Sequence, residues 1–303
     1  MVPGLIFGKV LRCPGSVFEP GAGDEYALVE NPLSYGILHT LKSNGVWMRP
    51  IRLDAEGMVT AELPSEPPKM IFTTPSHQFP TGAILPASRR IELIQYASRN
   101  QAYIVEDDYD SEFRFDGCPI ECMQSLAPDQ VIYVGTFSKT FMPALRIGYM
   151  VLPDELRERM CEAKFVSDIH SPVLEQLTLA KFMESGAFER HIRKMQKLYH
   201  RKRNYLISCL EKTFGEQVSI SGAAAGLHFV CSFEGVSFDS ALLEEMQKAG
   251  IEIAWAGKHM LDPERDEKYQ NALIFGYGNT PIEKMETGVN LLASIMKKHT
   301  LQL

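Results

Sequence analysis

Short apolar runs alternate along the chain with longer stretches in which apolar residues recur every three or four positions. Residues 26–29, 70–73 and 131–134 are rich in β-branched and aromatic side chains, which is the pattern of buried strands. Residues 33–43 and 86–98 show the spacing of amphipathic helices. Strands that alternate with helices in this order predict an α/β fold, with a mostly parallel sheet covered by helices on both faces.

The second half of the chain predicts a smaller α/β unit behind a long helix. Helices are expected over residues 173–184 and 187–214, and strands and helices alternate again between residues 218 and 297. We therefore predict a large domain over residues 1–185, a linking long helix over residues 186–214 and a small C-terminal domain over residues 215–303.

Composition narrows the classes of protein that fit this pattern. The 303 residues are 45% hydrophobic and 23% charged, which is typical of a folded globular chain. A formal charge of −7 argues against direct binding of nucleic acid by this chain. Because no apolar stretch approaches about 18 residues and no secretory signal is evident, we expect no membrane contact and a cytoplasmic location. The six scattered cysteines suit reduced thiols, and no metal site is expected.

Candidate chemistry concentrates where the apolar run at residues 131–134 ends at Gly135. Thr136, Ser138, Lys139 and Arg146 then place hydroxyl donors and cations in one short loop, a composition suited to holding a phosphate beside an amine. Lys139 is a candidate Schiff-base lysine, because ligands of open α/β sheets bind at the carboxyl ends of strands and partial desolvation there would favour the neutral amine. An ordinary surface loop that contains a lysine is the alternative.

A second polar segment, Glu-Asp-Asp-Tyr-Asp at residues 106–110, follows another predicted strand. Asp107 precedes Lys139 by 32 residues (139 − 107), so the two side chains can face one cleft from neighbouring strands. A carboxylate in that position could keep a pyridinium nitrogen protonated, and Tyr109 could donate to the phenolic oxygen of the same cofactor. A polar strand exit or a site for Mg²⁺ or Ca²⁺ are the alternatives.

Four motifs in this order resemble those of a known family: TPSHQFPTG at residues 74–82, EDDYDSEF at 106–113, GTFSKTFMPALRIGY at 135–149 and AGLH at 225–228. The set resembles the fold-type I, aminotransferase-like domain of MocR/GabR-type regulators of the GntR family. The resemblance implies that Lys139 forms the internal aldimine with pyridoxal 5′-phosphate, that Asp107 pairs with the pyridine nitrogen and that Tyr109 reaches the ring oxygen. It further implies phosphate contacts from Thr136, Ser138 and Arg146, and positions near the ring for His77, Gln78 and Tyr35.

The chain also departs from the pattern of that family. Such regulators begin with a winged helix–turn–helix domain and a linker, and residues 1–23 are too short and irregular for either or for a glycine-rich phosphate-binding turn. We therefore expect an effector domain without its DNA-binding part. Near the C-terminus, Gly278 in LIFGYGNTP occupies the position where we expect an arginine for the substrate carboxylate.

Three functions follow from these features. The first is an effector-sensing domain in which an amino compound exchanges with Lys139. The second is a working aminotransferase in which Lys139 also moves a proton, so the sequence leaves open whether the chain is an enzyme. The third is a structural remnant without pyridoxal phosphate. By resemblance, the expected partners are a small amino compound and a second copy of the chain in a homodimer.

Overall fold

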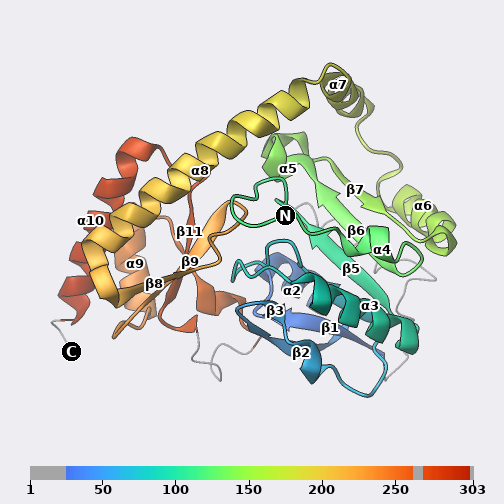
Figure 1. The fold of residues 1–303 in the computed structure, drawn as a ribbon, viewed down its shortest axis with the longest axis horizontal. Helices are drawn as coiled ribbons and strands as arrows, with labels where there is room; N and C mark the ends of the chain where they lie inside the picture. Colours follow the sequence, from blue (N-terminus) through green and yellow to red (C-terminus); the bar gives the residue numbers. More distant parts are fainter. Residues whose placement is uncertain (1–24, 262–268, 301–303) are drawn as a thin grey trace.

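The computed structural model describes residues 25–261 and 269–300, which form two β-sheets with helices packed around them (Figure 1). The fold is α/β, as the alternation of strands and helices predicts. Residues 1–24, where the sequence lacks a phosphate-binding turn, lie outside the described residues. The predicted domain boundaries stay predictions, although the second sheet is built entirely from residues after 215.

The larger sheet has seven strands in the order β3-β2-β1-β4-β5-β6-β7. Strand β1 pairs in parallel with β2 and β4, β4 pairs in parallel with β5, and β5 with β6, whereas the edge strands β3 and β7 are antiparallel to their neighbours. The bounds are β1 Tyr26–Asn31, β2 Trp47–Asp54, β3 Gly57–Met58, β4 Met70–Thr73, β5 Tyr103–Asp108, β6 Val131–Thr136 and β7 Gly148–Val151. The sheet is thus mostly parallel, as expected.

Helices cover both faces of this sheet, because successive residues of its strands point to opposite sides. On one face Leu38 of α2 belongs to a core with Val105, and on the other face Leu93 of α3 belongs to a core with Ile104. The helices of this part are α2 Tyr35–Ser43, α3 Ala87–Asn100, α4 Met123–Leu126, α5 Phe137–Thr140, α6 Asp154–Asp168 and α7 Val173–Glu184, and the 3₁₀ turns are η1 Thr60–Glu62 and η2 Pro143–Leu145.

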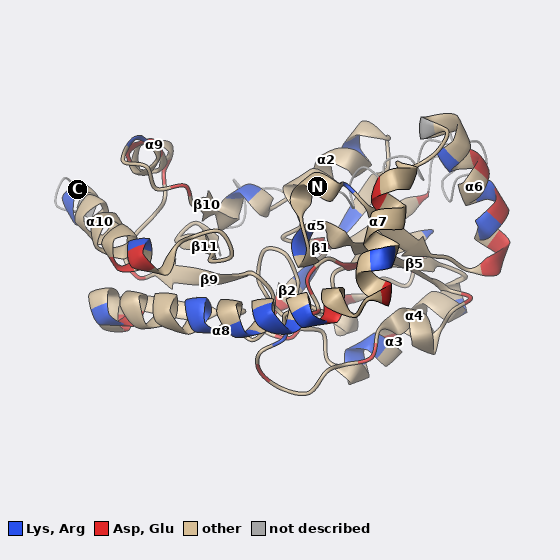
Figure 2. Ribbon diagram, turned by 90° about the horizontal axis from the view of Figure 1, so that it is seen from above, with Lys and Arg blue, Asp and Glu red and all other residues tan. Residues whose placement is uncertain are grey.

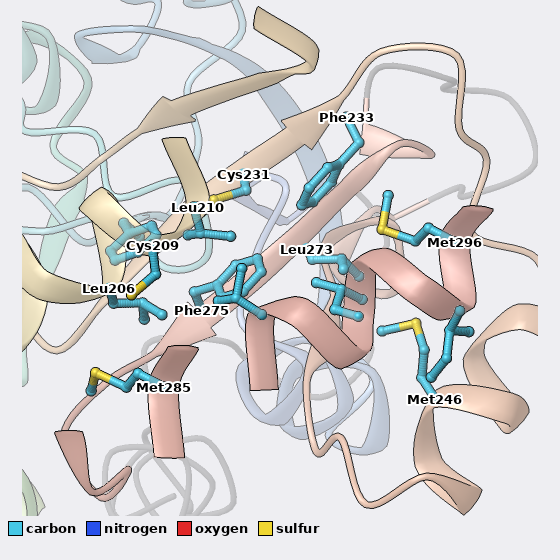
Figure 3. Packing of buried hydrophobic residues seen from close by; sticks show 14 of the residues in the cluster. Leu206, Cys209, Leu210, Cys231, Phe233, Met246, Leu273, Phe275, Met285 and Met296 are labelled. Carbon is cyan, nitrogen blue, oxygen red and sulfur yellow. The ribbon is translucent and has the colours of Figure 1, made fainter. Parts of the chain in front are cut away.

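The smaller sheet is antiparallel, in the order β10-β11-β9-β8. Its strands are β8 Val218–Ser221, β9 His228–Phe233, β10 Ala254–Trp255 and β11 Ala272–Gly276, and its other elements are α9 Ser240–Lys248, α10 Ile282–Thr300, η3 Gly215–Gln217 and η4 Ala256–His259. Its core packs Phe233 and Phe275 against Leu210, Met246 and Met296 from the surrounding helices (Figure 3). This part therefore has an apolar core of its own.

The long helix α8, Ala187–Phe214, runs between the two parts of the molecule (Figure 1). Lysines and arginines recur along it (Figure 2), and the sequence predicts that they form a solvated face. Arg203 is an exception, because it is buried and donates to Asp116 and to the carbonyl oxygen of Ala223. Arg203 therefore has a structural role and is not part of the solvated face.

Two further findings concern the helices and the cysteines of the described residues. None of their helices has the length and apolar character needed to cross a membrane. Their five cysteines, Cys118, Cys122, Cys161, Cys209 and Cys231, are free thiols.

Candidate functional site

A cavity of about 740 Å³ opens at the edge of the large sheet where the parallel strands end. Its walls come from the carboxyl ends of β4, β5 and β6, from α2 and from the small sheet. Open α/β sheets place ligands at this edge. Six of the nine residues that the sequence predicts as a site line this cavity together: Tyr35, Asp107, Tyr109, Thr136, Ser138 and Lys139.

Lys139 lies on a single helical turn, α5, and not in the loop that the sequence predicts. The turn begins directly after β6, and the Thr136 side chain caps it by accepting a hydrogen bond from the Ser138 amide at 3.1 Å. Lys139 is exposed, so the partial desolvation expected from its place after a buried strand is not found. The amine is therefore accessible from the cavity that it lines.

Asp107 is the buried acid of the site. It lies near the end of β5 opposite Val134 of β6, and only 4% of its surface is exposed. Burial, together with the charges of Asp108, Glu30 and Asp110, raises the pKa of Asp107 to about 8. Its Oδ1 atom has no hydrogen-bond partner among the described residues. A cationic N–H group in the cavity would satisfy that oxygen and stabilise the carboxylate.

Ser138 Oγ is the second buried polar atom without a partner among the described residues. Ser138 and Thr136 are 7% and 5% exposed, and both line the cavity. Because buried polar atoms are almost always paired in folded proteins, two such atoms in one cavity are suited to binding a polar ligand. The donor set fits pyridoxal phosphate, with Asp107 suited to the pyridine nitrogen and Ser138 and Thr136 to the phosphate.

Tyr109 is half-buried, and its hydroxyl group is held near the cavity. The hydroxyl donates to the carbonyl oxygen of His77 at 2.9 Å and lies 3.1 Å from His77 Nδ1. Desolvation, with Asp110 and Asp107 nearby, raises the pKa of Tyr109 well above its ordinary value. The phenol is thus a neutral hydrogen-bonding group at physiological pH.

The structure does not bring His77 and Gln78 to the cavity lining. The Gln78 amide donates to Glu30 and to the carbonyl oxygen of Pro32, at 3.1 and 2.9 Å, while its oxygen accepts from Thr81. Their neighbour Phe79 lines the cavity instead. His77 and Gln78 are not among the residues that line the cavity. Their direct contact with a cofactor ring stays a prediction.

Arg146 and Tyr35 occupy different positions relative to the cavity. Arg146 follows η2 in a left-handed conformation (φ 54°), is exposed and does not line the cavity, so its phosphate contact stays a prediction. Tyr35 lines the cavity, and the Lys258 ammonium lies 4.7 Å from its ring centroid.

Sequence reasoning missed Glu30, which organises the wall behind the cavity. Glu30 is 1% exposed and accepts from the Thr73 hydroxyl at 2.7 Å and from the Thr74 hydroxyl at 3.0 Å. Burial raises the pKa of Glu30. The sequence does place Glu30 near the end of the buried strand β1, as it places Asp107 near the end of β5. That similarity could have identified Glu30 as a candidate site residue.

Gly278 is not the residue that faces the cavity. Its carbonyl accepts from Lys202 at 2.6 Å, and Ile274 and Gly276 of β11 line the cavity in its place. The prediction that residue 278 faces a substrate carboxylate is therefore wrong. Among the lining residues that the structure describes there is no arginine.

Comparisons with known proteins show the family of the chain. The family described as "Aminotransferase class I and II" matches residues 21–250. "Uncharacterized HTH-type transcriptional regulator YdeL" of Bacillus subtilis is 37% identical over 78% of this chain and 51% of its own length. "Probable rhizopine catabolism regulatory protein MocR" of Rhizobium meliloti is 32% identical over 88% and 53%. The chain thus spans about half the length of these relatives. "Aromatic-amino-acid aminotransferase 1" of Thermococcus litoralis is 27% identical over 97% of this chain and 70% of its own length.

Solved structures extend the likeness to the fold. The kynurenine aminotransferase of Pyrococcus horikoshii, solved in complex with PMP, has a TM-score of 0.84 at 26% identity and covers 98% of this chain, which in turn spans 73% of it. The multiple substrate aminotransferase of Thermococcus profundus has a TM-score of 0.86 at 24% identity, with coverage of 100% and 74%. These likenesses confirm the fold-type I prediction. The family and these structures indicate pyridoxal phosphate as the cofactor.

Proposed function

Because the chain belongs to the aminotransferase class I and II family, we propose that it is the effector-sensing domain of a MocR/GabR-type regulator, which holds pyridoxal 5′-phosphate at Lys139. One observation carries the proposal: the unpartnered atoms Asp107 Oδ1 and Ser138 Oγ share one cavity with the exposed amine of Lys139. The similarity to transcriptional regulators supports the sensing role. A cytoplasmic homodimer is part of the same proposal.

Each residue has a role that follows from its position. Pyridoxal phosphate supplies an aldehyde that reacts with primary amines and a ring that withdraws electrons. Lys139 Nζ is the amine that would bind the aldehyde. Asp107 would hold a proton at the ring nitrogen, because a cation beside its buried carboxylate is favourable. Ser138 would donate to the phosphate, and Tyr109, which lines the cavity, would contact the ring.

A working aminotransferase is the second candidate. The match to an aromatic-amino-acid aminotransferase over 97% of this chain favours it. In that function Lys139 would also move a proton at the substrate carbon. The absence of arginine among the described lining residues counts against strong binding of a substrate carboxylate.

One experiment separates the two functions. The chain is loaded with pyridoxal phosphate, and its absorbance is followed as candidate primary amines are added, with and without a keto-acid acceptor. A sensor changes its spectrum without accumulating keto product over many turnovers, whereas an aminotransferase accumulates it. A chain that takes up no cofactor would contradict both functions and leave a structural role without pyridoxal phosphate.

A further inference from the structure

His77 and Asp110 form a buried pair at the cavity wall, in which Asp110 lines the cavity and His77 does not. Their side chains are 0% and 1% exposed, and His77 Nδ1 lies 3.1 and 3.2 Å from the two carboxylate oxygens. His77 comes from the loop after β4, and Asp110 directly follows the end of β5. Neither side chain has been given a role by the site so far, although the Tyr109 hydroxyl contacts the imidazole.

The hydrogen-bond partners of His77 determine where its protons lie. Its Nε2 atom is 3.3 Å from the carbonyl oxygen of Gly222, which can only accept, so Nε2 must carry hydrogen. Its Nδ1 atom faces the carboxylate of Asp110 and the oxygen of Tyr109. The single hydroxyl proton of Tyr109 is already donated to the His77 carbonyl oxygen at 2.9 Å. All the oxygens around Nδ1 are therefore acceptors.

Asp110 has a second hydrogen-bond partner besides His77. The same carboxylate accepts from the backbone amide of Leu227 at 3.1 Å, a bond that favours the ionised acid. His228, whose ring centroid lies 4.5 Å from that of His77, donates its Nε2–H to the Pro80 carbonyl oxygen at 3.0 Å. Burial and the charge of His77 lower the pKa of His228 well below its ordinary value. Of the two neighbouring, mutually tilted imidazoles, that of His77 is the one beside the Asp110 carboxylate.

We propose that His77 is a positioning residue, an imidazolium with a proton on both ring nitrogens that Asp110 and the Gly222 carbonyl hold in place. Its single Nδ1–H is shared between the Asp110 carboxylate and the Tyr109 oxygen, and its Nε2–H bonds to Gly222 in the segment between β8 and β9. The pair thereby connects the cavity wall of the large sheet to the segment between strands β8 and β9 of the small sheet. The part that concerns the Tyr109 hydroxyl and the cofactor rests on the proposed function.

The backbone packs closely against the pair at Gly226. Gly226 has φ +73°, and a Cβ atom there would lie 1.9 Å from His77 Nδ1 and 2.5 Å from Asp110 Oδ2. The Gly226 carbonyl accepts from the buried Tyr277 hydroxyl at 2.5 Å. A movement of the small sheet against the large one would therefore strain the contacts of the imidazolium directly.

The direct test needs no cofactor. The full chain is labelled with ¹⁵N-histidine, and long-range ¹H–¹⁵N spectra are recorded near neutral pH, with His77→Gln used to assign the His77 signals. We expect two protonated ring nitrogens for His77 and one for His228. Asp110→Asn keeps the shape of the side chain but removes its charge, so His77 should lose one ring proton. Asp129→Asn, at an exposed position, is the matched control.

Two results would overturn the proposal. The first is a His77 with one unprotonated nitrogen in the parent chain, or one that Asp110→Asn leaves unchanged in a folded protein. The second is a bound metal ion in place of the proton, because ligand atoms of His77, Asp110 and His228 lie within 4.8 Å of one another. Metal analysis would establish this second result if it found one ion per chain in the parent and none in His228→Gln.

The role toward Tyr109 has its own readout. In the cofactor-loaded chain, Asp110→Asn and Tyr109→Phe should shift the absorbance maximum in the same direction, and the double variant should match the single ones. Additive shifts would show that the pair does not act through Tyr109. If no absorbance band forms in the parent chain, the proposed function fails, while the ¹⁵N spectra still decide the protonation of His77.

Discussion

At Asp107, burial and neighbouring carboxylates act in the same direction on the protonation of the acid. Its pKa rises from 3.8 to about 8 in the folded chain without cofactor. Between these two values the folded chain keeps a proton that the unfolded chain releases, so the free energy of unfolding falls as pH rises through this window. Below the window the proton is bound in both states and this penalty is absent.

Replacing Asp107 by Asn should remove this dependence. Urea unfolding of the cofactor-free chain at about pH 5 and about pH 8 should show a smaller loss of stability in Asp107→Asn than in the parent. Asp129→Asn, at an exposed position, should leave the loss unchanged. Equal losses in all three proteins would contradict the buried, unpaired state of this acid.

Ser138 should contribute to cofactor affinity through its free hydroxyl. A hydrogen bond to a charged phosphate is worth about 1.5–3 kcal/mol, so Ser138→Ala should raise the dissociation constant of pyridoxal phosphate by roughly 10- to 100-fold. A fluorescence titration measures this change. Ser294→Ala, on the exposed side of α10, should bind as the parent does. Unchanged affinity in Ser138→Ala would place the phosphate elsewhere.

At the scale of elements, the segment between β8 and β9 depends on a glycine. Gly226→Ala combines a left-handed residue with a Cβ atom placed against the buried pair, so we expect a loss of about 2–4 kcal/mol in the free energy of unfolding. Gly235→Ala is the matched control, because Gly235 has φ +72° with open space around it. It should cost only about 1–2 kcal/mol. Equal losses in the two variants would show that the close packing at Gly226 does not contribute to the free energy of unfolding.

The sequence predicts the main elements because each carries a strong local pattern. The helices α7 and α8 begin and end where the periodicity predicts, and so does β4. The short turn α5 was missed, since four residues show no period, and so was the two-residue strand β3. A single helical turn such as α5 and a strand as short as β3 have too few residues to show a period of their own.

The candidate site was predictable to the extent that its residues end parallel strands. Asp107 and Lys139 meet at one edge because β5 and β6 are parallel neighbours. The orientation of His77 was not predictable, since Asp110 and Gly222, 33 and 145 residues away, determine it. Contacts of that range depend on the tertiary fold and leave no local pattern.

At the scale of the whole molecule, α6, α7 and the segment that joins them carry an exposed apolar surface. Its residues are 57–81% exposed and comprise Phe165, Val166, Ile169, Val173, Leu174 and Leu177. Patches of this kind mark interaction surfaces. In the homodimer that we propose, this surface should be covered by the second copy.

Analytical ultracentrifugation tests that arrangement. The parent chain should sediment as a dimer at micromolar concentration, and the double change Leu174→Asp and Leu177→Asp should convert it to a folded monomer. The matched control Lys248→Asp, on the exposed side of α9, should stay dimeric. A monomeric parent, or a double variant that remains a dimer, would contradict the expected interface.

The central claim is that this cavity holds pyridoxal phosphate through one particular amine. Its most direct test is borohydride reduction of the chain after incubation with the cofactor, followed by mass mapping of the modified peptide. The account predicts a phosphopyridoxyl group on Lys139, lost in Lys139→Ala and kept in Lys248→Ala. Modification at another lysine, or none at all in the parent chain, would contradict it.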